Sequence, residues 1–160
     1  ELALHLKGSD NGSSASGRYG AGYAGSMFHI RAGDLSTSAA DSLAEMQFDY
    51  IRETADSGES FVIVGRCSDI ILKGRPELIT IFISGDIENK IRRVMERRGI
   101  SRQEAMTEIV KIDKWRRKYH NRHGDTKWGD SRHYGMCINS SIGIEETVDV
   151  IESYISKFRH

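Results

Sequence analysis

Basic side chains that could bind phosphate are concentrated in one part of the chain. Residues 87–133 hold fourteen Lys and Arg against seven Asp and Glu, although the whole chain has a formal charge of zero. Eight of these basic residues are arginines between Arg92 and Arg122. A guanidinium group binds phosphate or carboxylate through two parallel hydrogen bonds, so the cluster favours anion binding. The alternative is an ordinary solvated helix surface, on which the arginines pair with Glu88, Glu96 and Glu108.

A glycine and an arginine follow a short apolar run. Residues 61–64 are rich in β-branched side chains, which predicts a strand buried on both faces. Gly65 would let a ligand approach the backbone at the end of this strand, and Arg66 could bind its phosphate. Asp69 has two interpretations: it holds the turn by pairing with Arg66, or it accepts hydrogen bonds from a ligand.

A second basic segment has the composition of a mobile lid. Asp113 and Arg116 open a stretch with few acidic residues that reaches Gly124, and residues 113–133 are predicted as the lid. Its other basic side chains are Arg117, Lys118 and Arg122. Such a lid could close over a transferring phosphoryl group, neutralise its charge and exclude water. A basic surface loop is the alternative.

The same segment gives little support for binding a metal ion or nucleic acid. His120 and His123 are one helical turn apart, but the spacing offers no further ligand, and no metal site is predicted. Trp115 and Trp128 do not alternate regularly with basic residues, so they indicate packing rather than stacking on nucleic-acid bases.

Strands and helices alternate along the chain. Strands are predicted at 61–64, 79–83 and 136–139, and helices from about 39 to 57, 87 to 98, 101 onwards and 144 to 158. Ser101 and Glu104 have the spacing of a capping box. The pattern predicts an α/β fold with a mainly parallel sheet, whose binding crevice lies beyond the carboxyl ends of the strands.

Length and composition are those of one globular domain. The chain has 160 residues, of which 38% are hydrophobic and 29% charged. Residues 1–6 resemble the middle of an amphipathic helix, residues 8–17 a flexible Gly/Ser linker, and residues 18–160 the domain. There is no apolar run of about 18 residues, and the two cysteines are far apart. A reducing cytoplasm without a membrane partner is therefore expected.

Several of these segments together resemble the cytidylate kinase-like family of the P-loop nucleoside monophosphate kinases. The similar segments are residues 62–72, 94–101, 113–119, 127–130, 137–141 and 143–145. The resemblance implies a three-layer fold with a parallel sheet between helices. It also implies phosphoryl transfer from ATP with Mg²⁺ to a nucleoside monophosphate.

The resemblance assigns roles to individual residues. Arg66 would contact the acceptor nucleotide, with Asp69 nearby, and Arg93 and Arg97 would contact phosphates. The remaining assignments are Arg116 as the lid arginine with Asp113 as its partner, and Asn139 and Ser140 near the donor base. Nucleotides are the implied partners, and nucleic acid is not expected.

The family's first strand and its phosphate-binding loop have no counterpart in the sequence, which contains no Gly-Lys pair. The fold is therefore predicted to be incomplete and its activity impaired. The strands at 61–64 and 79–83 would have to close the gap or take a strand from a second copy, which would make a homodimer. A non-catalytic domain that binds nucleotides or other anions is the alternative function.

Overall fold

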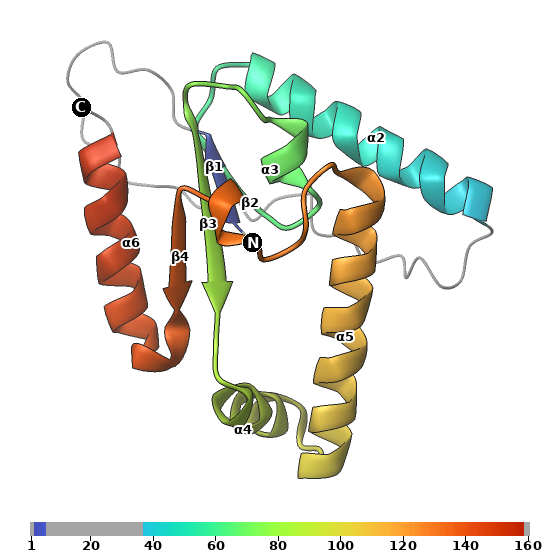
Figure 1. Ribbon diagram of the computed structural model, residues 1–160, viewed down its shortest axis with the longest axis vertical. Helices are drawn as coiled ribbons and strands as arrows, with labels where there is room; N and C mark the ends of the chain where they lie inside the picture. Colours follow the sequence, from blue (N-terminus) through green and yellow to red (C-terminus); the bar gives the residue numbers. More distant parts are fainter. Residues whose placement is uncertain (1, 6–36, 159–160) are drawn as a thin grey trace.

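The computed structural model describes residues 2–5 and 37–158 (Figure 1). The strands are β1 (Leu2–His5), β2 (Phe61–Val64), β3 (Leu78–Ser84) and β4 (Met136–Asn139). The α-helices are α2 (Thr37–Asp56), α3 (Ser68–Ile71), α4 (Ile87–Arg98), α5 (Arg102–His123) and α6 (Ile144–Phe158), and two short 3₁₀ turns span Ser131–His133 and Ser140–Ile142. The linker predicted at 8–17 lies outside the described residues.

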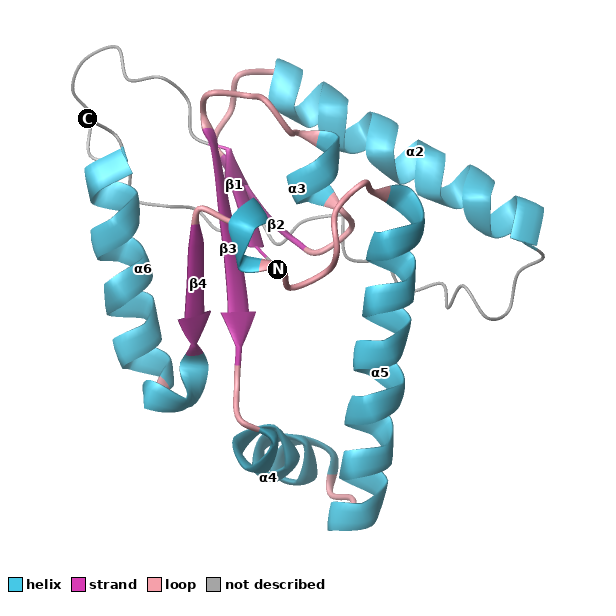
Figure 2. Cartoon of the chain, in the orientation of Figure 1, coloured by secondary structure: helices cyan, strands magenta, loops and turns pink. Residues whose placement is uncertain are grey.

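The described strands form one four-stranded sheet in the order β2-β1-β3-β4. β3 and β4 are parallel, and β1 runs antiparallel to both of its neighbours. β2, β3 and β4 therefore point in the same direction, so that their carboxyl ends meet at one edge of the sheet. Helices alternate with these three strands (Figure 2), which confirms an α/β fold. The prediction of a mainly parallel sheet is wrong for the described strands, because β1 makes two of their three pairings antiparallel.

The helix predicted for residues 1–6 is wrong, because Leu2–His5 form β1. β1 fills the gap that the sequence predicted between the strands at 61–64 and 79–83. Leu2 pairs with Val64 of β2 on one side and with Ile81 of β3 on the other. Four residues make little more than one helical turn, whereas in the sheet the backbone of β1 is paired on both sides. Tertiary pairing therefore outweighs local pattern.

Each face of the sheet packs against different helices. Ile79 and Ile81 of β3 point to one face, where they pack with Ile151 and Ile155 of α6. On the other face, Phe61 and Ile63 of β2 pack with Ile51, Ala55 and Leu72 from α2 and the end of α3. Figure 1 shows α6 beside β4, with α2 and α3 beyond β2.

The prediction that residues 61–64 are buried on both faces is wrong. Val62 and Val64 share the face of Ile79 and Ile81, but α6 packs only over the β3–β4 half of that face. Val64 is consequently 76% exposed. Along α2, Phe48, Ile51 and Ala55 are buried, whereas Met46 is exposed.

The end of α4 and the start of α5 are each fixed by residues next to them in the sequence. Gly99 caps α4 in the left-handed conformation, with φ 64°. Ser101 and Glu104 form the predicted capping box at the start of α5. Together they produce a sharp turn between α4 and α5, which pack against each other through Ile91, Ala105 and Ile109.

Candidate functional site

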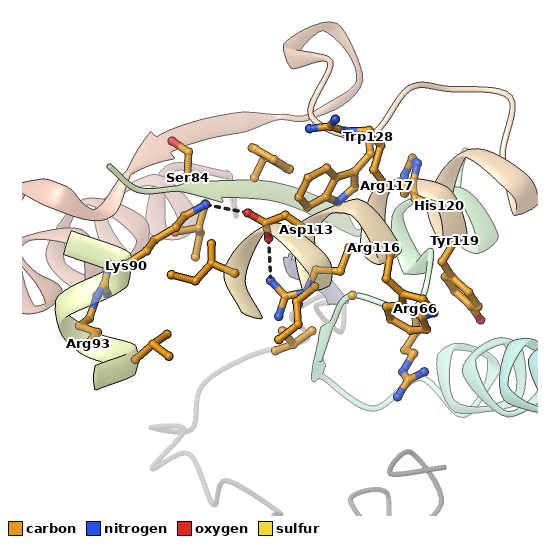
Figure 3. Close-up of a pocket in the computed structure, with 18 of the residues that line it drawn as sticks. Arg66, Ser84, Lys90, Arg93, Asp113, Arg116, Arg117, Tyr119, His120 and Trp128 are labelled. Carbon is orange, nitrogen blue, oxygen red and sulfur yellow. Dashed lines mark hydrogen bonds and ion pairs between the residues drawn. The ribbon is translucent and has the colours of Figure 1, made fainter. Parts of the chain in front are cut away.

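A cavity of about 1080 Å³ lies at the carboxyl ends of β2 and β3. Its walls come from the Gly65–Cys67 turn after β2, the end of β3, one side of α4, the second half of α5, and Trp128. This is the edge at which α/β sheets usually bind ligands. Figure 3 shows Lys90 and Arg93 on one side and Arg66 on the other, with Asp113 and Arg116 between them.

The turn that carries Arg66 has an unusual backbone. Gly65, Arg66 and Cys67 have φ angles of 77°, 62° and 57°, so three consecutive residues are in the left-handed region. Only glycine adopts this region freely, and each of the other two residues costs roughly 1–2 kcal/mol. Cys67 is 1% exposed. Strained backbone of this kind persists only where neighbouring contacts fix it, and it clusters at functional sites.

An acidic side chain lies among the basic ones. The Asp113 carboxylate accepts a hydrogen bond from Lys90 Nζ at 3.1 Å, and its other oxygen is 3.6 Å from Arg116 Nη1. Lys90 is on α4 and the other two residues are on α5, so Asp113 joins the two helices at the cavity. The carboxylate also offsets the repulsion between the two cations, which both line the cavity.

Further arginines line the α4 and α5 walls. Arg93 donates weakly to Ser140 Oγ, at 3.4 Å, while Ser140 Oγ donates to the Ser84 backbone oxygen at 2.9 Å. This chain of contacts connects α4 to the ends of β3 and β4. Arg97 lies one turn further along α4, and Arg117 follows Arg116 on α5; both line the cavity. Five arginines and one lysine from three segments therefore surround one space.

Aromatic rings form another part of the wall. Phe82 of β3 meets the Trp128 ring edge-on, with centroids 5.4 Å apart, and also contacts Tyr134. The Arg117 guanidinium lies 5.9 Å from the centre of the Trp128 ring. The face of an aromatic ring attracts a cation, so Trp128 helps to hold the Arg117 guanidinium at the cavity wall.

A buried polar pair lies behind the arginines. His120 Nε2 is 3.0 Å from Asp69 Oδ2, and the two side chains are 3% and 5% exposed. An ionised carboxylate can only accept a hydrogen bond, so the N–H group at His120 Nε2 is the donor in this contact. Asp69 belongs to α3 and His120 to α5, and their contact therefore fastens α5 to the segment that follows Arg66.

Burial changes the acidity of two neighbouring rings. The pKa of the Tyr119 hydroxyl rises to about 12, chiefly because burial disfavours the phenolate, and the nearby Arg66 guanidinium opposes part of this rise. The pKa of His123 is lowered, first by burial and then by the positive charge of Arg122. Both rings are therefore neutral at pH 7.5.

Sequence similarity adds to this geometry. A model of the cytidylate kinase-like family matches residues 5–142. The chain belongs to this family.

One solved structure is similar to this cytidylate kinase-like chain. It is the crystal structure of an uncharacterized protein from Eubacterium ventriosum ATCC 27560, with 44% sequence identity and a TM-score of 0.70. The similarity covers 72% of the present chain and 65% of the other. No curated protein matches the chain.

The structure gathers most of the predicted site residues. Those that line the cavity are Arg66, Arg93, Arg97, Asp113, Arg116 and Arg117. Ser140 is connected to the cavity through its contact with Arg93. Asn139, at the end of β4, donates to the Asp86 carboxylate just before α4. Arg122 is paired with Asp41 of α2. Neither Lys118 nor Asn139 contributes to the cavity wall.

Ion pairing accounts for only part of the arginine cluster. Arg102 binds Glu88 through two hydrogen bonds, and Arg98 binds Glu108. These two arginines match the alternative of a solvated helix surface. The cavity wall is different, because five arginines and Lys90 share it with two carboxylates, Glu96 and Asp113, and Asp113 is itself shared between Lys90 and Arg116.

Sequence reasoning did not single out Lys90, Phe82 or the burial of His120. Lys90 was counted only in the total charge of its helix. His120 was weighed as a metal ligand, but in the structure it contacts Asp69.

No group of three His, Cys, Asp or Glu suited to a metal ion occurs among the described residues. None of the helices within residues 37–158 is long and apolar enough to cross a membrane.

Proposed function

We propose that the chain transfers a phosphoryl group from ATP to a nucleoside monophosphate. The observation that supports this most directly is the convergence of five arginines and Lys90 on one cavity at the carboxyl ends of parallel strands. Phosphoryl transfer depends mainly on positioning and on stabilising negative charge, and cationic side chains on opposite walls suit both tasks. Family membership points in the same direction.

The geometry suggests a division of labour between the walls. Arg66 lies across the cavity from Lys90 and Arg93, so the acceptor phosphate would bind Arg66 and the donor phosphates would bind α4. Arg116 lies between them on α5, where it can follow negative charge as it develops on the transferring group. Asp113 would hold Arg116 in place while the site is empty.

The described residues fit nucleotide phosphates better than a magnesium ion held by the protein. Lys90, Arg93 and Arg97 offer a series of donors on one helix face, which suits a polyphosphate. Asp113 is engaged by two cations. Mg²⁺ would neutralise phosphate charge while bound to the donor itself, and none of the steps proposed here depends on a protein ligand for it.

Small nucleotides of the cytoplasm are the proposed partners. The cavity walls are formed by segments of one chain, and the opposing cations surround one cavity rather than forming an extended stripe. An extended polyanion such as nucleic acid would need the latter arrangement.

Release of ADP from ATP, measured with CMP, UMP, AMP and GMP in turn, tests the proposal. We expect turnover with at least one of these acceptors, and Arg116→Ala should lower kcat about 10²–10³-fold, the usual loss for a group that stabilises the transition state. Arg52→Ala is the matched control, because Arg52 pairs with Asp49 on the outside of α2. It should leave turnover unchanged.

Two results would contradict the kinase proposal. The first is an absence of ADP with every monophosphate in the presence of Mg²⁺. If the same protein still binds one of them saturably, the alternative of a non-catalytic nucleotide-binding domain is correct. The second is equal loss of activity in Arg116→Ala and Arg52→Ala, which would show that the cavity has no special role.

A further inference from the structure

The left-handed turn at Arg66 needs contacts that hold it. The Ser68 hydroxyl donates to the Gly65 backbone oxygen at 2.8 Å, which closes the turn locally. The Cys67 side chain is buried with Ala44 and Phe48 of α2. Tyr119 of α5, the helix that carries Arg116 and forms the facing wall of the cavity, packs against the same cluster, but neither of these two contacts is a polar connection to α5.

The Asp69–His120 hydrogen bond makes that connection. Asp69 follows Arg66 by three residues, and His120 follows Arg116 by four, one turn further along the same face of α5. The pair is buried, so water does not weaken it as it weakens the exposed ion pair of Lys73 with Asp125. His120 Nδ1 has no hydrogen-bond partner in the described part of the chain. Asp69 is therefore the group that fixes the orientation of the ring.

We propose that Asp69 and His120 form a positioning pair, which holds the strained Gly65–Cys67 turn and so fixes Arg66 relative to Arg116. The inference rests on the proposed function for the role of Arg66 in binding the acceptor. The locking of the turn is a property of the folded chain alone. When the pair is broken, the turn relaxes toward ordinary backbone angles, Cys67 leaves its buried position, and Arg66 moves away from the acceptor.

Reactivity of the Cys67 thiol tests the lock without any substrate. In a Cys137→Ser background Cys67 is the one remaining thiol, because the chain has two cysteines. We expect Asp69→Asn and His120→Gln to raise the rate of labelling by a disulfide reagent at least tenfold, under conditions where circular dichroism shows a folded chain. Asp56→Asn is the matched control, since Asp56 forms an exposed ion pair with Arg75 that joins the end of α2 to the loop after α3 and leaves the Asp69–His120 contact intact. Its labelling rate should not change.

Kinetics then test the consequence for Arg66. Asp69→Asn should raise KM for the monophosphate about tenfold and leave KM for ATP within about twofold, because the donor is proposed to bind the opposite wall. General destabilisation would not separate the two substrates. In an Arg66→Ala background, Asp69→Asn should have no further effect on KM for the monophosphate, since the two changes act through one side chain.

The two readouts separate failure of this inference from failure of the proposed function. Unchanged Cys67 labelling in both folded variants would overturn the lock, whatever the activity. Equal changes in the two KM values would overturn the positioning role. If the wild-type chain shows no turnover, binding of the monophosphate replaces KM, and the labelling result still decides the lock. If His120→Gln does not fold, Asp69→Asn suffices, because asparagine has nearly the same shape as aspartate.

Discussion

Gly129 is a position where one methyl group should have a measurable effect on the cavity wall. Its φ is +80°, and a Cβ at this residue would lie 3.1 Å from Phe82 Cζ. Phe82 has little room to retreat, because it is packed between the rings of Trp128 and Tyr134. Gly129→Ala therefore combines a backbone cost with a steric one.

The two costs can be separated with a second glycine. Gly74 has a similar φ of +87° and no atom within 4 Å of an added Cβ. Gly74→Ala should thus show the backbone cost alone, about 1 kcal/mol. Gly129→Ala should cost a further 1–3 kcal/mol or so, the usual range for overpacking. For a domain of this size each kcal/mol lowers Tm by roughly 2–4 °C.

Thermal unfolding followed by circular dichroism measures both variants, and tryptophan fluorescence reports whether the Trp128 environment changes. We expect Gly129→Ala to unfold at a lower temperature than Gly74→Ala and to shift the emission spectrum. If the free energies of unfolding agree within about 0.5 kcal/mol, the contact between Phe82 and residue 129 is loose and the reasoning fails.

Three further predictions concern stability and pH. Ser101→Ala should lower the free energy of unfolding by about 1 kcal/mol, because it removes the capping box of α5; urea denaturation that shows no loss would contradict this. Tyr119→Phe should remove a tyrosine that ionises near pH 12 in absorbance titrations at 295 nm. Its raised pKa also means that the unfolded chain ionises first, so wild-type stability should fall as pH rises from about 10 to about 12. The pKa of His123 is lowered in the folded state, so the unfolded chain takes up the proton first as pH falls below about 6.5. His123→Gln should reduce the resulting loss of stability between pH 7.5 and 5, and an equal loss in both proteins would refute that assignment.

Local signals were enough to predict the longer helices and the outer strands, but not the short helix α3. The glycine after α4, the capping box of α5 and the bounds of α6 depend on neighbouring residues, and the structure agrees with all of them. The same holds for the strands at 61–64 and 136–139. Short-range patterns carry this information because helix ends and turns are stabilised within a few residues.

Features that depend on distant residues could not be predicted in this way. The pairing of β1 with β2 and β3 joins residue 2 to residues 64 and 81, and no local pattern records it. The contact of Asp69 with His120 spans 51 positions. Val64 is apolar, and its exposure follows only from the extent of α6 on that face. The basic charge of the candidate site was visible in the sequence, whereas the buried contact between Asp69 and His120 was not.

The direction of β1 places its first residue at the edge of the sheet where the cavity lies. Leu2 pairs with Val64 and Ile81, so the strand begins at the edge of the sheet where Arg66 lies. α6 runs in the same direction as β1 and ends away from this edge, where the Tyr154 hydroxyl donates to the backbone oxygen of Gly135, just before β4 starts. A dye attached at Leu2 would therefore sense the arrival of a nucleotide, whereas one attached at Phe158 would lie at the opposite edge of the sheet.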